Sequence, residues 1–562
     1  MTDTKFGGYI SNVTFNNGEN MDVAPNDIIV FVGPNNAGKS QSLKDIYQLS
    51  SKKLSTVVVS DIAVTKYSAP ISEVLSKIAP AQDHGNYTSY SVLGKNMDIW
   101  DYTDKNFPKE QYFGNFRDIF VANLDTSARL TICRPPQNIN RNGAKQHPIH
   151  YAAFDRKYRK WLSDNFQKAF HSGLTPNTQY GATIPLCIGD PVLLDGQYED
   201  EQSRMEAYAE ILGKYKQVQD QGDGIKSFTG ILLYLMLDHF NTYLIDEPES
   251  FLHPPQARIM GQIIGQTLGS HQQAFISTHS EEIIKGLLEV CPQRIKIVRI
   301  TRDKDTNHFS ILNNEDFSKV WSDPLLRYSN IMVSLFHKTV VLCESDSDCK
   351  MYSIIENHIK QEEQKYSETL FIHCGGKHRM SKIIIALRAL DIDVKLIADI
   401  DVLNDETVFR GIAEAFDIDY SSIQADYNNI VANLHSPKER INRNTAKASI
   451  NQVLERSTST ELSNIELKDI REVISTVSKW DGIKKSGAAA LPAGNATASY
   501  RKIDQRLREN GIFIVPVGEL ECFVKEIGGH GPEWVNIVFE TYPNLDDDVY
   551  RTITEFVNSM KL

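Results

Sequence analysis

The chain has 562 residues, of which 41% are hydrophobic and 23% are charged, as in a globular protein of two to four domains at roughly 150 residues each. No stretch reaches the roughly 18 consecutive apolar residues of a membrane helix, and the first residues lack the pattern of a secretory signal. The net charge of −12 excludes a generally basic surface, so any nucleic-acid binding needs local basic residues or bridging metal ions.

Seven cysteines are scattered along the chain without a CxxC pair, which argues against a disulfide framework and a structural zinc site and favours a reducing cytoplasm. We therefore expect a cytoplasmic protein without membrane contact. Local basic surface is available in three stretches, although an ordinary solvated loop or helix explains each of them better. These stretches are residues 134–147, 156–161 and 436–447.

Strands and helices alternate through the first 325 residues. Strands are expected at GYISNVTFNN (8–17), DIIVFV (27–32), ARLTIC (128–133), TYLIDEPE (242–249) and QQAFISTHS (272–280). Residues 200–240 are predicted to be mainly helical, and the last of these strands is followed by a helix over 280–290. This alternation predicts an α/β sheet that binds its ligands at the ends of its strands.

A phosphate-binding loop follows the second strand. The segment GPNNAGKS (33–40) matches the pattern G-x-x-x-x-G-K-[ST], and it stands between a strand and a helix, as this motif requires. Gly33 and Gly38 let backbone N–H groups surround phosphate oxygens, and Asn36 is predicted to contact the same phosphates. Lys39 would neutralise the β- and γ-phosphates of ATP, and the Ser40 hydroxyl would ligate Mg²⁺. The alternative is a chance glycine-rich turn.

Two further strand ends carry residues suited to ATP hydrolysis. Asp246 would hold Mg²⁺ through water, and Glu247 would act as the general base that polarises the attacking water. His279 ends the next strand, where it would sense the γ-phosphate. A solvated strand end and a purely structural histidine are the alternatives.

These residues resemble the ABC-type ATPase head of structural-maintenance, recombination and defence proteins over residues 1–325. The resemblance implies a signature turn at QGDGIKSF (221–228), in which Gly222 and Gly224 form a reduced version of the LSGGQ-like motif. It also implies that PESFLHP (248–254) lies at a dimer interface, and that Gln137 belongs to the glutamine loop. We therefore expect a homodimer or higher homo-oligomer, in which each signature turn covers the ATP of its partner.

A second α/β block begins near residue 335. Its expected strands are 338–345, 369–376, 393–401 and 511–517, with helices near 349–360 and 378–390. A long, polar and mostly helical segment over about 405–510 separates the last two strands. No internal repeat and no sustained heptad pattern is present, so a long coiled-coil arm is not expected.

Acidic residues follow two of these strands. Glu344 and Asp348 follow the first strand, and Asp399 and Asp401 follow the third, with Asp405 close behind. Adjacent parallel strands bring their carboxyl ends together, so these carboxylates would repel one another unless Mg²⁺ or Mn²⁺ lay between them. Two such ions about 4 Å apart stabilise phosphodiester cleavage. A solvated rim is one alternative; a calcium loop is a poorer one, because Asn404 stands where that loop requires glycine.

Glutamate after one apolar strand and D-x-D after a later one resemble the TOPRIM domain, over residues 336–405 and the strand 511–517. The turn HCGGKH (373–378) is similar to the second strand and glycine turn of that family, while Ser345 replaces the glycine of its E-G pair. The resemblance implies that a lysine and another acid from the C-terminal part join the site. We predict Lys485 and Glu521 for these roles, with Lys484 and Glu519 as the alternatives.

An ABC-type ATPase domain over 1–325 followed by a TOPRIM nuclease domain over 336–545, with a helical insertion at about 405–510, resembles the layout of the OLD (overcoming lysogenization defect) family. That family includes the ATPase-nuclease of the Gabija system and retron-associated effectors. The resemblance implies an ATP-regulated DNA endonuclease of antiphage defence that uses Mg²⁺ or Mn²⁺. Partners would be DNA and a helicase-like protein, or a reverse transcriptase with its DNA.

Two rival functions remain open on the sequence. One is a DNA repair or recombination ATPase whose TOPRIM domain binds DNA without cutting it. The other is topoisomerase-like cleavage and rejoining, which needs a nucleophilic tyrosine and hence one of the 23 tyrosines of the chain.

Overall fold

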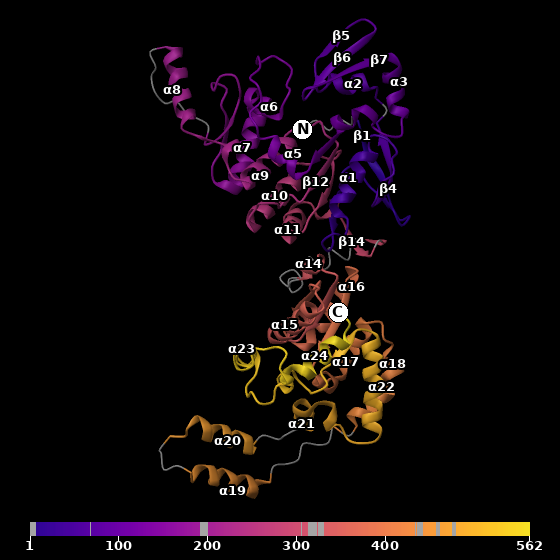
Figure 1. Ribbon diagram of the computed structural model, residues 1–562, viewed down its shortest axis with the longest axis vertical. Coiled ribbons are helices and arrows are strands. Elements are labelled where there is room, and N and C mark those ends of the chain that lie inside the picture. The colour runs from indigo at the N-terminus through magenta and orange to yellow at the C-terminus, as the bar shows by residue number, and fades with distance from the viewer. Residues whose placement is uncertain are drawn as a thin grey trace. The chain divides into compact units, whose positions relative to one another are not determined.

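The structure is a computed structural model that divides into two compact units, residues 1–336 and 337–562 (Figure 1). The sequence predicts domains over 1–325 and 336–545; the two units meet at 336/337, and the second reaches residue 562. Each unit is described separately. The described residues are 7–67, 69–190, 200–304, 306–312, 323, 331–432, 434, 442–456, 461–474 and 479–562.

The first unit is built on a six-stranded sheet with strand order β15-β14-β3-β13-β12-β8. Its strands are β3 Ile28–Val32, β8 Val121–Leu124, β12 Thr242–Asp246, β13 Gln273–Ser277, β14 Ile295–Asp303 and β15 Thr306–Ile311. All neighbouring strands run parallel except β14 and β15. The central strand β3 is apolar and buried at every position, as expected for a parallel strand covered on both faces.

Helices that precede or follow these strands in the chain carry the predicted motifs. They are α1 Lys39–Leu49, α5 Thr126–Thr131, α9 Asp223–Leu235, α10 Pro254–Thr267 and α11 Glu281–Val290. Helices α10 and α11 approach closely at two glycines. A Cβ atom at Gly261 would lie 2.4 Å from the Ile283 carbonyl oxygen, and one at Gly286 would lie 2.1 Å from that of Arg258. These contacts fix the helices that follow β12 and β13 against each other.

The predicted strand over residues 128–133 is wrong. The strand is β8, and Asp125 directly after it begins helix α5 by accepting a hydrogen bond from the Ala128 N–H at 2.8 Å. The helix then packs on α9, where a Cβ atom at Gly230 would lie 2.3 Å from the Arg129 carbonyl oxygen. Helix capping and this close packing outweigh the strand propensity of the β-branched residues.

This unit also contains three smaller antiparallel sheets and further helices. The sheets are β1 Gly8–Phe15 with β2 Asn20–Asp22 and β4 Val59–Lys66; β5 Ala81–Asp83, β6 Tyr87–Val92 and β7 Lys95–Trp100; and β9 Leu174–Pro176, β10 Leu186–Ile188 and β11 Lys216–Gln217. The helices are α2 Ile71–Ser76, α3 Asp101–Asn106, α4 Arg117–Phe120, α6 Pro148–Phe154, α7 Arg156–Phe170, α8 Glu201–Gly213 and α14 Ile331–Ser334.

The second unit contains a four-stranded parallel sheet with strand order β17-β16-β18-β19. Its strands are β16 Thr339–Cys343, β17 Thr369–His373, β18 Asp393–Ala398 and β19 Ile512–Ile514. Helix α15 Asp346–Glu362 follows β16, and α16 Met380–Ala389 follows β17. The predicted mixed α/β class and parallel sheet are confirmed.

Helices fill the described part of the segment between β18 and β19, as predicted. They are α17 Glu406–Ala415, α18 Tyr420–Val431, α19 Arg443–Leu454, α20 Asn464–Ile474, α21 Lys479–Ser486 and α22 Asn495–Glu509. After β19 the chain forms α23 Gly531–Thr541 and α24 Arg551–Ser559. Tyr352 of α15, Trp534 of α23 and Phe556 of α24 share one buried apolar cluster, which explains why the unit extends to the C-terminus.

Within the described ranges, no helix combines the length and the apolar composition needed to cross a bilayer.

Candidate nucleotide and metal sites

The phosphate-binding loop has the backbone conformation that its sequence predicts. Gly33, Asn36 and Gly38 have positive φ angles of 137°, 60° and 105°. A Cβ atom at Gly33 would lie 2.0 Å from the Ile300 carbonyl oxygen, so only glycine fits there. Gly38 is the N-cap of α1, which places the loop at the positive end of the helix dipole. This geometry fits the binding of a nucleotide phosphate.

Lys39 lies inside the loop. Its side chain is almost completely buried, and Nζ donates hydrogen bonds to the carbonyl oxygens of Gly33 at 2.8 Å and Pro34 at 2.7 Å. Burial lowers the pKa of Lys39 to about 8, although Glu247, Glu249 and Asp246 favour the charged form. The loop backbone therefore surrounds the Lys39 ammonium group at the position where phosphate oxygens would bind.

The acidic end of β12 meets the end of β13, as predicted from the parallel order. The Ser277 hydroxyl donates a hydrogen bond to Asp246. Glu247 has a left-handed φ of 46°, and its Oε1 lies 3.7 Å from Nε2 of His279. Burial and the nearby Lys39 lower the pKa of His279, although Glu247 and Asp246 favour the charged ring. The predicted general base and γ-phosphate sensor are thus neighbours.

Two residues of this site escaped the sequence analysis. Glu249 accepts a hydrogen bond from the His279 N–H at 2.7 Å, while its second oxygen is buried without a partner; burial raises the pKa of Glu249. Arg129 is completely buried and donates from Nη1 to the Asp246 carbonyl oxygen at 2.5 Å. Glu249 stands close to Asp246 in the segment DEPE, so the sequence could have suggested it. No local pattern identifies Arg129, which lies 117 residues before Asp246.

The glycines of the predicted signature turn lie at the start of a helix, as expected, and their signature role stays a prediction. Gly222 is the N-cap of α9, and Gly224 lies in its first turn. A Cβ atom at Gly224 would lie 2.6 Å from the carbonyl oxygen of Phe251, a residue with a φ of 68° in the PESFLHP loop. The two segments that the ABC resemblance assigns to a dimer interface therefore pack against each other within one chain.

Gln137 follows a helix rather than the expected strand, because Thr126–Thr131 form α5. Its backbone forms an isolated β-bridge with Thr183, and its carbonyl oxygen lies 2.9 Å from Nε2 of His150. Its assignment to a glutamine loop stays a prediction.

In the second unit, three carboxylates meet at the ends of two neighbouring parallel strands. Ligand oxygens of Glu344, Asp399 and Asp401 all lie within 4.8 Å of one another. Burial, reinforced by the neighbouring acids, raises the pKa of Glu344 and raises that of Asp399 well above its usual range. One oxygen of Asp401, Oδ1, is buried without a hydrogen-bond partner. A set of hard oxygen donors in mutual repulsion fits a divalent cation such as Mg²⁺ or Mn²⁺.

Two of the predicted acids cap helices. Asp348 accepts a hydrogen bond from the Ser345 N–H at 2.8 Å, and Ser345 Oγ accepts one from the Asp348 N–H at 3.3 Å. This capping box begins α15, with Asp348 outside the three-carboxylate group. Asp405 caps α17 by accepting from Thr407 and Val408. Ser345 has an extended φ of −126°, so its position does not require the glycine of the E-G pair.

Lys484, rather than the predicted Lys485, lies at the acidic group. Its Nζ is 3.7 Å from Asp401 Oδ2 and 3.3 Å from Glu519 Oε2, whereas Lys485 is exposed. Burial lowers the pKa of Lys484, but Asp401 and Glu519 outweigh burial and raise it. The end of α21 is held against the turn after β19, because a Cβ atom at Gly518 would lie 2.0 Å from the Lys484 carbonyl oxygen.

Glu521 and Lys377 complete this region. Glu521 accepts a hydrogen bond from the Gly531 N–H at 3.0 Å, and its charge contributes to the raised pKa of Asp348. Glu521 is not among the three converging carboxylates. Lys377, which the sequence analysis did not assign, has Nζ 3.2 Å from Asp401 Oδ2 and 3.3 Å from the Asp401 carbonyl oxygen. Its position after a glycine turn at a strand end could have identified Lys377 as a candidate from the sequence.

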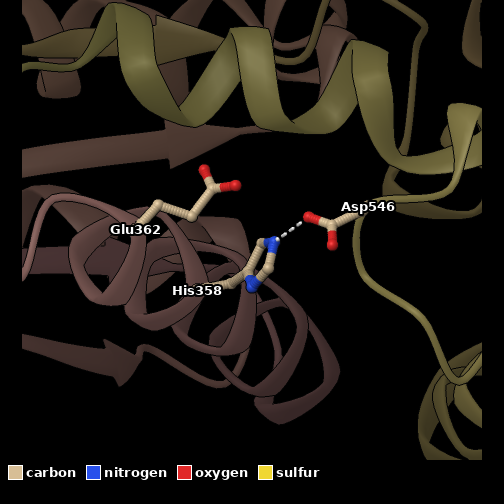
Figure 2. Close-up of side chains that lie close together, drawn as sticks. All are labelled: His358, Glu362 and Asp546. Atoms are coloured by element: carbon tan, nitrogen blue, oxygen red, sulfur yellow. Dashed lines mark hydrogen bonds and ion pairs between the residues drawn. The ribbon is translucent and has the colours of Figure 1, made fainter.

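A second group with metal-ligand side chains lies on the surface of the same unit. Figure 2 shows His358 and Asp546 pointing toward each other, with Glu362 one turn further along α15. His358 Nε2 lies 3.0 Å from Asp546 Oδ1. Glu362 and Asp546 are exposed, and the hydrogen bond ties α15 to the segment before α24. The contact between His358 and Asp546 is sufficient to explain why these side chains lie together on the surface.

Two family models match the chain. Residues 212–285 match "AAA domain, putative AbiEii toxin, Type IV TA system", and residues 335–401 match "Overcoming lysogenization defect protein-like, TOPRIM domain". The chain is also 22% identical to the Old nuclease of Escherichia phage P2 over 301 residues, which are 52% of this chain and 45% of that protein. The chain therefore spans less than half the length of this curated relative.

Solved structures of SMC heads are similar to part of the chain. A structure of an SmcHead bound to the C-winged helix domain of ScpA covers 56% of this chain and all of that chain, with a TM-score of 0.34 and 12% identity. An SMC head domain from Thermotoga maritima covers 55% of this chain and all of that chain, with a TM-score of 0.28 and 11% identity.

The fold and the family models indicate a mixed α/β unit that matches an AAA ATPase domain, followed by a unit that matches a TOPRIM domain. Together with the similarity to the Old nuclease, these matches support a relationship to ATPase–TOPRIM proteins of the OLD family.

Proposed function

We propose that this protein is an ATP-regulated, divalent-metal-dependent DNA endonuclease that acts in antiphage defence. The observation that carries the proposal is the convergence of Glu344, Asp399 and Asp401, with one Asp401 oxygen buried and unpartnered. Three like charges gathered at a strand edge are unfavourable on their own, which favours a role in holding cations. The similarity to a nuclease supports phosphodiester cleavage as the reaction.

The residues of the TOPRIM site would have different roles in cleavage. Glu344, Asp399 and Asp401 would hold Mg²⁺ or Mn²⁺, and a bound ion there would polarise the phosphodiester and activate water. Lys484 would face the negative charge that develops on the phosphate, since its ammonium group already lies beside Asp401. Glu519 keeps Lys484 in place.

The ATPase site would control access or assembly. Gly33, Asn36, Gly38 and Lys39 would hold the phosphates of ATP, and Ser40 and Asp246 would hold its Mg²⁺. Glu247 would accept the proton of the attacking water, and His279 beside it would sense the γ-phosphate. Gly222 and Gly224 would cover the nucleotide of a second copy, which makes a homodimer or higher homo-oligomer the proposed assembly.

The proposed partners are DNA and, within a defence system, a helicase-like protein or a reverse transcriptase with its DNA. The OLD-family relationship supports DNA, and the two defence partners follow from the Gabija and retron branches of that family.

The test is nicking of supercoiled plasmid in Mg²⁺ or Mn²⁺ by wild type and Asp399→Ala. We expect the wild type to cut and EDTA to abolish cutting. Asp399→Ala should not cut, but it should retain ATP hydrolysis because the ATPase site has its own ligands. If Asp399→Ala cuts at the wild-type rate, the acidic group is not the nuclease centre. If the wild type binds DNA and hydrolyses ATP without cutting, the non-cutting repair or recombination ATPase is the better function.

A further inference from the structure

A basic loop adjoins the acidic group of the second unit. This loop, here called the β17–α16 loop, comprises residues 373–379, from the last residue of β17 to the residue before α16. Its sequence HCGGKHR contains two cations and two histidines among seven residues. The chain carries a net charge of −12, so nucleic-acid binding would need a local basic surface of this kind.

The backbone of the loop is fastened to the acidic site. Gly375 and Gly376 have positive φ angles of 67° and 115°, which turn the chain sharply after β17. The Gly376 N–H donates to the Glu344 carbonyl oxygen at 3.3 Å, and the Cys374 N–H donates to that of Cys343 at 3.0 Å. The loop is therefore held at the end of β16, where the first metal-ligand candidate stands.

Lys377 joins the loop directly to the acidic group. Its Nζ contacts Oδ2 of Asp401 at 3.2 Å, and Lys484 approaches the same oxygen at 3.7 Å. The other Asp401 oxygen, Oδ1, is the buried and unpartnered one. The side chain of Lys377 is 20% exposed, so the ammonium group borders both the carboxylates and the surface. A phosphate oxygen at the carboxylate group would have Lys377 as a neighbour.

Arg379 is the second cation of the loop. Its side chain is exposed, as is that of His378, and no ion pair joins Arg379 to another residue in the described ranges. Arg379 is the N-cap of α16, a ten-residue helix whose N-terminal dipole adds positive potential at the same place. The loop thus offers two cations two residues apart in the sequence, Lys377 in contact with Asp401 and Arg379 exposed to solvent.

We propose that the β17–α16 loop binds the DNA backbone beside the cleavage site, with Lys377 on the scissile phosphate and Arg379 on a neighbouring phosphate. The inference rests on the proposed DNA substrate and adds the surface that holds it. None of the three basic stretches that the sequence singled out includes this loop. Backbone contacts of this kind position a strand without reading its sequence.

The test measures DNA binding without cleavage. Fluorescence anisotropy of a labelled single-stranded oligonucleotide, in EDTA and at 50 to 200 mM salt, yields the slope of log K against log salt. Arg379→Ala should lower the magnitude of this slope by about 0.7, the value expected for one lost phosphate contact to a single strand. Arg379→Lys should retain the wild-type slope, because it preserves the charge.

Lys365→Ala is the matched control. Lys365 precedes β17, so it lies toward the opposite end of that strand, and its charge is paired with Glu363 at 2.9 Å. The substitution removes the same charge from the same unit, and we expect it to leave the slope unchanged. Melting curves of all variants show whether the fold is retained, and Arg379→Gln serves as a second exposed substitution with the same expectation as Arg379→Ala.

A separate readout addresses Lys377. Lys377→Ala should slow plasmid cleavage at saturating Mn²⁺ while retaining ATP hydrolysis, and Lys377→Arg should recover part of the rate. Wild-type slopes for Arg379→Ala and Arg379→Gln, or full cleavage by Lys377→Ala, would overturn the loop assignment and leave the nuclease proposal standing. Absence of DNA binding by the wild type itself would overturn the proposed substrate as well.

Discussion

Glu247 illustrates how single residues are prepared for chemistry. It follows a buried strand, adopts a left-handed backbone conformation, and holds its two oxygens near Ser250 and His279. A left-handed conformation is costly for a residue with a side chain, and such strain is typical of functional sites. Lys39 is similarly constrained, since it is buried and bonded to two carbonyl oxygens of its own loop. Both side chains are thus preorganised.

We expect Glu247→Gln to reduce ATP turnover by about 10²- to 10⁴-fold, the range of a general-base contribution, because an amide cannot accept the proton of water. Nucleotide binding should be preserved, since the phosphate loop is unchanged. Phosphate release and calorimetric titration with ATP measure the two quantities. Lys39→Ala is the comparison, for which binding itself should be lost. Equal turnover by wild type and Glu247→Gln would reject the assignment.

Asp399 is expected to destabilise the metal-free protein. Asp399→Asn keeps the shape of the side chain but removes one of three crowded charges, so the variant should melt at a higher temperature in EDTA. If the relief is about 1 kcal/mol, Tm rises by about 2–4 °C for a unit of this size. Differential scanning calorimetry in EDTA measures the shift. An unchanged or lower Tm would show that the carboxylates are not in mutual repulsion.

At the scale of elements, strand ends and helix starts assign the acids to different tasks. The ends of β16 and β18 bring Glu344, Asp399 and Asp401 together, whereas Asp348 and Asp405 face the first turns of α15 and α17. A capping carboxylate satisfies backbone N–H groups and stabilises its helix. The direction of the effect of a substitution should therefore distinguish the two kinds of acid.

Asp405→Ala should lower stability by about 1 kcal/mol, because the N–H groups of Thr407 and Val408 lose their acceptor. This change is opposite in sign to the one expected for Asp399→Asn under the same conditions. Cleavage should persist, since Asp405 lies outside the converging carboxylates. The measurements are Tm in EDTA and plasmid nicking in Mn²⁺. Loss of cleavage without loss of stability would make Asp405 a ligand.

At the scale of the whole molecule, the two candidate sites belong to different units. The proposed ATPase residues lie within residues 1–336 and the carboxylate group lies within 337–562. Gly224 and the PESFLHP loop form one packed surface in the first unit, with Phe251 57% exposed. An exposed aromatic side chain beside the signature turn is a suitable contact for a second ATPase head.

We expect the protein to be at least a dimer, and ATP with Glu247→Gln should favour the paired state because the nucleotide is bound but not hydrolysed. Light scattering coupled to size-exclusion chromatography measures the mass with and without ATP. Phe251→Ser is the matched test of the interface and should weaken pairing without changing ATP binding. A monomer under all of these conditions would contradict the head-to-head assembly.

Much of the fold and the positions of most candidate site residues at strand ends follow from local sequence. The apolar strand before GPNNAGKS, the acids after β12, and the acids after β16 and β18 are visible as short patterns, and parallel strands must bring such ends to one edge. The strand predicted at 128–133 failed because Asp125 and the packing of Gly230 favour a helix there. Competition between propensity and packing is not decided by a few neighbouring residues.

By itself, the sequence determined the two-domain ATPase and TOPRIM layout, the phosphate loop and the metal-ligand candidates, because each of these depends on residues close together in the chain. Only the tertiary structure decided that Lys484 rather than Lys485 faces Asp401, that Lys377 joins it, and that Arg129 supports Asp246. These contacts join segments 24 to 117 residues apart. The direction of each side chain is set by how helices and turns pack over that distance, as the close approach of Gly518 to Lys484 demonstrates.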